Sequence, residues 1–300
     1  MTSSHDRARA KRVYEYLFQF ISSRIRVSEL KTIHLQEYVD RRMKDGVSAQ
    51  TVTRELVPIV SALKSGYKYF ESLDDYQPPR IPRPKVSKTK KERVISQAEQ
   101  DRIFGYLFSP RFENELKQEP DTRRRTGQFL LFCLLSLSRP GEIAALKKID
   151  VDLDSGIVSI TGRKSRYTAT QIVRRLKMSA TMIQIIEERA KLANSDYLFT
   201  RSGYVTPKMY LYLRKACEAA GVKYSRTEPD GISFHTARHT GITTLVQSGM
   251  DLKTVGKMAG HSDSQMTLYY THTNAEMVNR AADILEQKMG RNSGNYLRGS

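Results

Sequence analysis

Three kinds of side chain that act on phosphate groups stand close together between residues 234 and 272. His235, Arg238 and His239 are spaced so that all three can share one face near the start of a helix. His261 follows an Ala-Gly pair, and Tyr270 stands nine residues further on. Imidazoles move protons, guanidinium groups hold phosphate oxygens, and an activated tyrosine is a nucleophile. The segment therefore favours phosphate-transfer chemistry.

Two simpler interpretations compete for the same histidines. His235 and His239 have the H-x-x-x-H spacing of zinc hydrolases, but Thr236 stands where those enzymes carry their general-base glutamate. Arg238 also places a cation between the two potential ligands, which opposes metal binding. Polar residues that only cap a helix would explain this short motif if it stood alone. We expect neither a metal nor a cofactor.

The composition indicates a polyanionic partner. The 300 residues include 50 Lys and Arg against 32 Asp and Glu, a net charge of +18, which exceeds what solubility requires and points to nucleic acid. Cys133 and Cys217 are the only cysteines, too few for a disulfide framework or a cysteine metal cluster. No signal-peptide core or membrane-length apolar run is present, so we expect a cytoplasmic protein, associated with the nucleoid in a prokaryote.

The N-terminal part, residues 1–75, has the periodicity of a helical bundle. One helix is expected around an apolar stripe, a second between Thr32 and Gly46, and a third after Ser48, with Pro58 bending or breaking it. The stripe of the first helix comprises Val13, Leu17, Phe20 and Ile21.

Residues 76–94 form a basic, proline-rich connection with four prolines and seven Lys or Arg residues. Proline at this density favours an extended, semi-rigid chain. One interpretation is a solvated interdomain linker, and the other is a linker that lies along DNA. In the second case the candidate DNA contacts are Arg83, Lys85, Lys88, Lys90 and Lys91.

Residues 95–287 read as helices with a small antiparallel sheet. A capping box at Ser96 predicts one helix start, and Pro140 directly after Arg139 predicts another. Ser179 and the pair Thr206-Pro207 each predict a further start. Strands are expected at 156–162 and 168–173, with a basic turn between them, and a third at 197–200. The tail, residues 288–300, is expected to be disordered.

Five motifs taken in order resemble those of the tyrosine recombinases, the phage-integrase and Xer-like family of site-specific DNA recombinases. They are Arg139-Pro-Gly-Glu142, the basic hairpin at 163–166, His235-Thr-Ala-Arg-His239, Ala259-Gly-His261 and Tyr270-Thr-His272. The resemblance covers almost the whole chain and implies a mainly α fold with a small antiparallel sheet. A helical core-binding (SAM-like) domain would occupy residues 1–75, and a catalytic domain residues 95–287.

The resemblance also implies a role for each matching residue. Glu142 and His239 would support the site, and Arg163 and Arg166 on the hairpin would contact DNA. Arg163 is the rival to the hairpin lysine, and Tyr269 is the rival nucleophile. The implied catalytic set is Arg139, Lys164, His235, Arg238, His261 and Tyr270.

Three features depart from the family pattern. Leu137 stands where a glycine usually precedes the first arginine by two residues, and Ala237 stands where leucine is frequent. The hairpin also continues into a second basic pair, Arg174 and Arg175. These departures concern the subfamily and the identity of the hairpin lysine rather than the chemistry.

The expected reaction is site-specific recombination of double-stranded DNA at inverted-repeat core sites. It would proceed through a 3′-phosphotyrosine and a Holliday junction, with integration, excision, inversion or resolution as the outcome. Four subunits would assemble on paired sites through the C-terminal helix, residues 274–289. A type IB topoisomerase, which nicks and rejoins DNA as a monomer, is the enzymatic alternative, and a DNA-binding protein with an inactive site is the non-enzymatic one.

Overall fold

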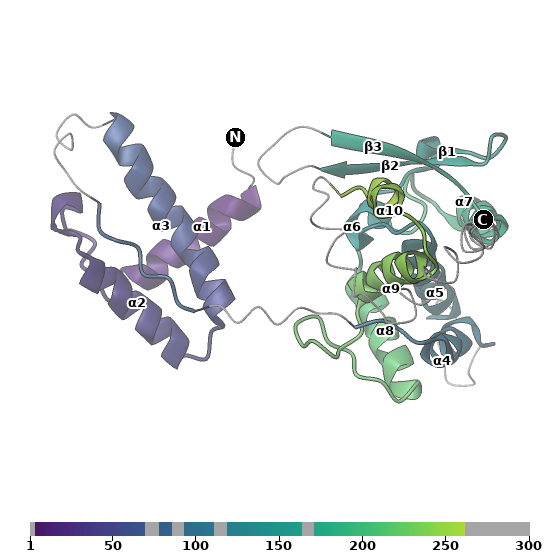
Figure 1. Ribbon diagram of the computed structural model, residues 1–300, viewed down its shortest axis with the longest axis horizontal. Helices are drawn as coiled ribbons and strands as arrows, with labels where there is room; N and C mark the ends of the chain where they lie inside the picture. Colours follow the sequence, from purple (N-terminus) through teal and green to yellow (C-terminus); the bar gives the residue numbers. More distant parts are fainter. Residues whose placement is uncertain (1–3, 70–77, 86–92, 111–118, 164–170, 262–300) are drawn as a thin grey trace, which may run out of the picture. The chain divides into compact units, whose positions relative to one another are not determined.

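The chain forms two compact units, Met1–Thr89 and Lys90–Ser300, each with its own hydrophobic core. The computed structural model describes residues 4–69, 78–85, 93–110, 119–163 and 171–261. Within these ranges the structure is mainly helical, with one three-stranded antiparallel sheet (Figure 1). The predicted fold class is therefore confirmed. None of the helices in these ranges is both long and apolar enough to cross a bilayer.

The first unit contains the three predicted helices, α1 (Ser4–Leu17), α2 (Thr32–Lys44) and α3 (Ala49–Tyr69), with a short 3-10 turn, η1 (Val27–Glu29). Pro58 lies inside α3, which continues through it. The predicted stripe of α1 needs one correction, because the helix ends at Leu17 and the chain then turns. That turn returns Ile21 to the core and leaves Phe20 40% exposed.

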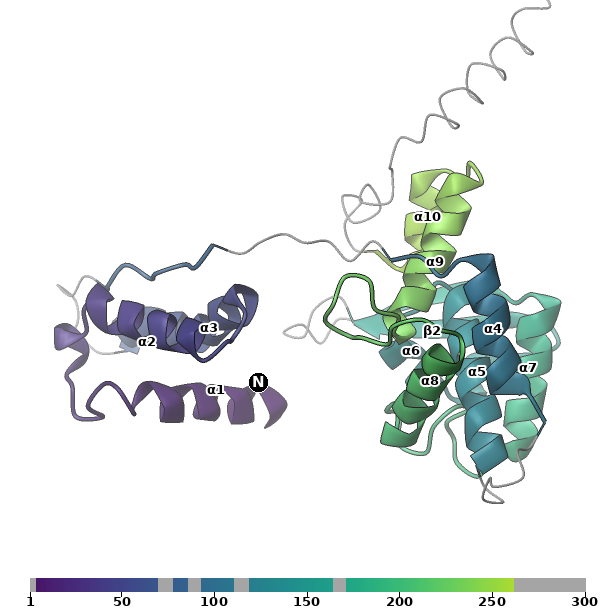
Figure 2. The ribbon, with the colours of Figure 1, turned by 90° about the horizontal axis from the view of Figure 1, so that it is seen from below.

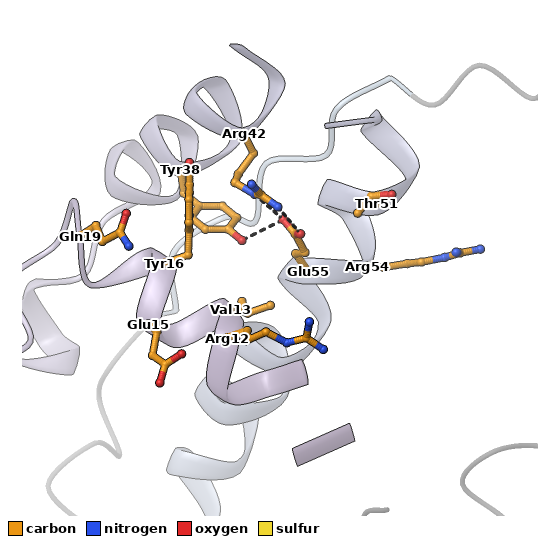
Figure 3. Close-up of a pocket in the computed structure, with 10 residues that line it drawn as sticks. All are labelled: Arg12, Val13, Glu15, Tyr16, Gln19, Tyr38, Arg42, Thr51, Arg54 and Glu55. Carbon is orange, nitrogen blue, oxygen red and sulfur yellow. Dashed lines mark hydrogen bonds and ion pairs between the residues drawn. The ribbon is translucent and has the colours of Figure 1, made fainter. Parts of the chain in front are cut away.

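A hollow of about 560 Å³ opens in the first unit between α1, α2 and α3 (Figure 3). Arg42 donates to both carboxylate oxygens of Glu55, at 2.9 and 2.6 Å, and the Tyr38 hydroxyl donates to the same carboxylate at 3.0 Å. Glu55 thus neutralises one of the arginines that line the hollow. None of the predicted catalytic residues contributes to its wall.

The second unit is organised around α5 (Glu119–Leu135), against which four longer helices and the short α6 (Pro140–Ala144) pack (Figure 2). Three of their boundaries fall where the sequence predicts. Ser96 caps α4 through the expected capping box, Ser179 caps α7, and Thr206 caps α8. The four helices are α4 (Gln97–Phe108), α7 (Ala180–Leu192), α8 (Pro207–Ala219) and α9 (Phe234–Gln247).

The sheet has the order β1-β2-β3, with β1 (Val151–Asp152), β2 (Ile157–Arg163) and β3 (Gln171–Lys177). Arg163 pairs with Gln171 at the end of the β2–β3 ladder where residues 164–170 connect the two strands. The second strand runs four residues further than the sequence predicted, to Lys177, because the ladder continues until Ile157 meets Lys177. Residues 164–170, with the expected start of that strand, lie outside the described residues.

The strand predicted at 197–200 is wrong. Tyr197 makes one isolated bridge to Lys147, and the chain then turns instead of joining the sheet. The Thr200 hydroxyl donates to the Ala144 carbonyl at 2.8 Å and accepts from the Gly203 amide at 3.0 Å. Side-chain hydrogen bonds that satisfy nearby backbone groups favour a turn over a strand. This loop is consequently anchored on the short helix α6 (Pro140–Ala144).

Candidate active site

The first turn of α9 presents the predicted His-x-x-Arg-His group. Phe234 is the first residue of the helix and packs edge-on against Phe129 of α5, with ring centroids 5.0 Å apart. This anchor fixes the helix rotation, so that His235 is exposed, His239 is half-buried and Arg238 is 5% exposed. The helix start therefore holds one buried cation between two accessible imidazoles.

Arg238 is held by the end of α5. Its Nη1 donates to the Leu137 carbonyl oxygen at 2.6 Å, across 101 residues of sequence. The two helices approach closely here, because a Cβ at Gly241 would lie 2.4 Å from the Leu134 carbonyl oxygen. Glycine is thus required one turn after Arg238, and the close approach brings the arginine to its carbonyl partner.

The backbone conformation of Leu137 explains why the family usually has glycine at this position. Its φ is +53°, in the left-handed region that costs a non-glycine residue about 1 kcal/mol. The Ser138 amide donates to the Cys133 carbonyl, so Leu137 ends α5 in a left-handed cap of the kind that glycine normally fills. The leucine side chain offsets the strain because it is 1% exposed and packs in a small cluster with Ile242 and Val255.

Arg139 is the N-cap residue of α6, and Glu142 in the first turn of that helix holds it. The Glu142 carboxylate accepts from the Arg139 amide at 2.9 Å and from its Nη1 at 3.0 Å. Pro140 fits the first helical position because its missing N–H would have no partner there. Glu142 is 8% exposed and the Arg139 side chain 40%, so a buried carboxylate orients a partly exposed cation.

His261 follows α10 (Leu252–Ala259) directly after Gly260, whose φ of +67° closes the helix. Burial of the imidazole, together with the positive charges of Arg238 and Arg139, lowers the pKa of His261 to about 4. His261 is therefore neutral at physiological pH and retains one N–H donor. Because the charges of both arginines act on the imidazole, His261, Arg139 and Arg238 lie in one region of the second unit.

The depressed pKa of His261 makes stability depend on pH. In an unfolded chain the pKa of histidine is about 6.5, so between pH 6.5 and about 4 the unfolded state binds a proton that the folded state does not. We expect wild-type stability to fall as the pH is lowered across this window relative to His261→Gln, with a constant difference above pH 7. Thermal unfolding of both proteins from pH 4.5 to 8 measures this, and parallel curves would contradict a buried neutral imidazole.

The remaining predicted site residues are distributed as follows. Arg163 is the last residue of β2, and Lys164 directly follows this strand in the sequence. Arg83 and Lys85 belong to the first unit. The residues outside the described ranges are Lys88, Lys90, Lys91, Lys164, Arg166, Tyr269, Tyr270 and the helix predicted at 274–289.

One site residue was missed by the sequence analysis. Arg174 was noted only as half of a basic pair, yet it is 8% exposed and binds Glu142 and Ser138, each at 2.7 Å. The sequence contained a sign of this role, because Arg174 alternates in step with Ile172 and Leu176 on the inward-facing side of β3. An arginine in the inward phase of a strand needs a buried partner.

The zinc interpretation finds no ligand set in the described ranges. Within them, no three His, Cys, Asp or Glu side chains gather as a metal-binding group. His235 and His239 are accompanied instead by Arg238, whose positive charge also acts on His261.

Comparison with known proteins assigns the chain to a family. The model of the phage integrase family matches residues 111–277, more than half of the chain. A relative named tyrosine recombinase XerA, from Thermococcus kodakarensis, is 26% identical over 253 residues, covering 79% of this chain and 78% of the relative. The chain belongs to the phage integrase family, and it is a tyrosine recombinase, an enzyme that breaks and rejoins DNA.

Solved structures agree on the fold. The Tn1549 transposon integrase, in complex with circular intermediate DNA, aligns with a TM-score of 0.68 at 16% identity, over 95% of this chain and 94% of that one. The XerH site-specific recombinase bound to palindromic difH substrate aligns with a TM-score of 0.62 at 18% identity, over 93% and 79% of the two chains.

Proposed function

We propose that the enzyme recombines double-stranded DNA at specific sites through Tyr270. The single observation that carries the proposal is the convergence of Arg139, Arg238 and His261 from three separate helix ends. Two fixed cations and a neutral N–H donor suit a phosphodiester whose charge rises during attack. Lys164 and Tyr270, which are assigned from the sequence motifs, complete the proposed catalytic set.

In the proposed reaction the Tyr270 oxygen forms a bond to phosphorus while the bond to the 5′ oxygen breaks. His235, exposed at the start of α9, takes the tyrosine proton, and Lys164 gives a proton to the departing 5′ oxygen. The products are a 3′-phosphotyrosine and a free 5′-hydroxyl. Because one phosphodiester replaces another, no external energy source is required, and attack by a second 5′-hydroxyl reverses the step.

The arginines supply most of the electrostatic stabilisation in this scheme. Each guanidinium stays protonated and can present two parallel donors to non-bridging oxygens. Arg238 is fixed by the Leu137 carbonyl and Arg139 by Glu142, so their orientation is set before DNA binds. Preorganised donors of this kind each contribute a rate factor of about 10² to 10³.

The wider proposal concerns how DNA is gripped. Two basic parts joined by the connection at residues 76–94 would hold opposite sides of a duplex, with Arg83 and Lys85 among the phosphate contacts. The overall charge of +18 supports this arrangement. We propose further that the helix at 274–289 docks on a neighbouring subunit, which gives a tetramer on two inverted-repeat sites and a Holliday junction as intermediate.

The test uses plasmids that carry two copies of short inverted repeats taken from the DNA beside the gene. We expect recombination of these plasmids in the presence of EDTA, and DNA binding that weakens steeply as salt rises, because phosphate contacts dominate affinity. Plasmids with scrambled repeats are the control. Relaxation of any supercoiled plasmid, without recombination, would instead indicate a topoisomerase, and loss of activity in EDTA would contradict the metal-free mechanism.

A further inference from the structure

We propose that Arg174 is a positioning residue for Arg139, an inference that rests on the proposed function. Nη2 of Arg174 donates to Oε2 of Glu142 at 2.7 Å and to the Ser138 hydroxyl at 2.7 Å. The same carboxylate accepts from Nη1 of Arg139 through its other oxygen at 3.0 Å. Glu142 is thus held between two guanidinium groups, one buried and one partly exposed.

The strand fixes Arg174 in this place. Arg174 pairs with Ile160 of β2, and side chains along β3 alternate between the interior and solvent. The neighbouring Arg175 is exposed as a result, whereas Arg174 is 8% exposed. Two adjacent arginines of one strand therefore have different environments, which provides a matched pair for experiment.

Two glycines make room for the Arg174–Glu142 pair. A Cβ at Gly162 of β2 would lie 2.8 Å from Oε1 of Glu142, and a Cβ at Gly260 would lie 2.8 Å from Nη1 of Arg174. Gly260 directly precedes His261, so the Arg174 guanidinium packs on the backbone that carries that imidazole. The pair accordingly joins the segments that carry Arg139 and His261 to the β2–β3 hairpin. Lys164 directly follows the last residue of β2.

Glu142 depends on Arg174 for its charge. Burial alone would raise the pKa of the Glu142 carboxyl, but hydrogen bonding and charge from Arg174, followed by those from Arg139, hold the pKa below its ordinary value. Of the two arginines that contact the buried Glu142 carboxylate, only Arg139 would remain if Arg174 were removed. We expect the carboxylate then to draw the Arg139 guanidinium inward, away from the position it needs to bind phosphate.

The experiment compares Arg174→Met with Arg175→Met in single-turnover cleavage of nicked DNA at saturating enzyme. We expect Arg174→Met to cleave about 10- to 100-fold more slowly, the effect of displacing a catalytic group by about 1 Å. Arg175→Met should cleave at the wild-type rate. The salt dependence of DNA binding should be unchanged in Arg174→Met, because a residue that contacts no phosphate releases no counterion.

A double-mutant cycle tests whether Arg174 acts through Glu142. In a Glu142→Gln background no buried carboxylate remains to be held, so adding Arg174→Met should change the rate less than about threefold. Arg174→Lys keeps the charge but loses the fork, and we expect a smaller loss than in Arg174→Met. If Arg174→Met fails to fold, the same double-mutant cycle is measured with Arg174→Lys, and the same comparison of cleavage rates tests the inference.

The outcomes separate this inference from the proposed function. A wild-type rate for Arg174→Met, additive losses in the cycle, or a reduced salt slope would each overturn the positioning role. Failure of the wild-type protein to form any covalent adduct with DNA would instead overturn the proposed function itself.

Discussion

Arg238→Lys is expected to slow DNA cleavage by a factor of about 10² to 10³, the effect of losing one fixed donor to a charged transition state. Arg238 is 5% exposed and its Nη1 donates to the Leu137 carbonyl at 2.6 Å, and in the proposed reaction the same guanidinium also binds the reacting phosphate. A lysine ammonium is a point charge on a flexible stem and cannot satisfy both demands. Single-turnover cleavage of nicked substrate measures the loss.

DNA affinity provides the contrast for this variant. Arg238 would be one phosphate contact among many, and the substitution by lysine keeps the positive charge, so we expect the Kd to change by less than about tenfold. Arg214→Lys is the matched control, because Arg214 lies on the surface of α8 with a side chain 55% exposed. A cleavage rate within about threefold of wild type in Arg238→Lys would show that the fork is dispensable, because the predicted loss is far larger.

The sequence was sufficient for residues whose role depends on local spacing. His235, Arg238 and His239 share a helix start because helical periodicity dictates it, and the cap at Ser96 follows from a four-residue pattern. Arg139 and Glu142 likewise interact within one turn. In each case the partner lies within a few residues along the chain, so pattern and chemistry together predict the contact.

Contacts between distant segments could not be predicted in the same way. Arg174 meets Glu142 across 32 residues of sequence. This contact depends on the pairing of β2 with β3, and the sequence predicted the second of these strands to end at residue 173, before Arg174. The Leu137 carbonyl became a partner of Arg238 only through the close helix approach at Gly241. The strand predicted at 197–200 failed because tertiary hydrogen bonds of Thr200 favoured a turn.

Tyr270→Phe is expected to abolish covalent attachment to DNA while DNA binding is retained. The change removes one hydroxyl, and phenylalanine has no atom that can attack phosphorus. Tyr269→Phe is a matched control at the adjacent position and should keep the wild-type cleavage rate. Tyr270 is preferred over Tyr269 by its nine-residue step from His261 and by the Thr-His pair that follows it.

The most direct measurement is the amount of SDS-resistant protein–DNA adduct on a nicked inverted-repeat substrate, compared among wild type, Tyr269→Phe and Tyr270→Phe. Our account predicts adduct for wild type and Tyr269→Phe, with phosphate linked to Tyr270 in the peptide recovered after proteolysis, and no adduct for Tyr270→Phe at equal DNA occupancy. Adduct from Tyr270→Phe, or its loss in Tyr269→Phe alone, would contradict the assignment of Tyr270 as the nucleophile.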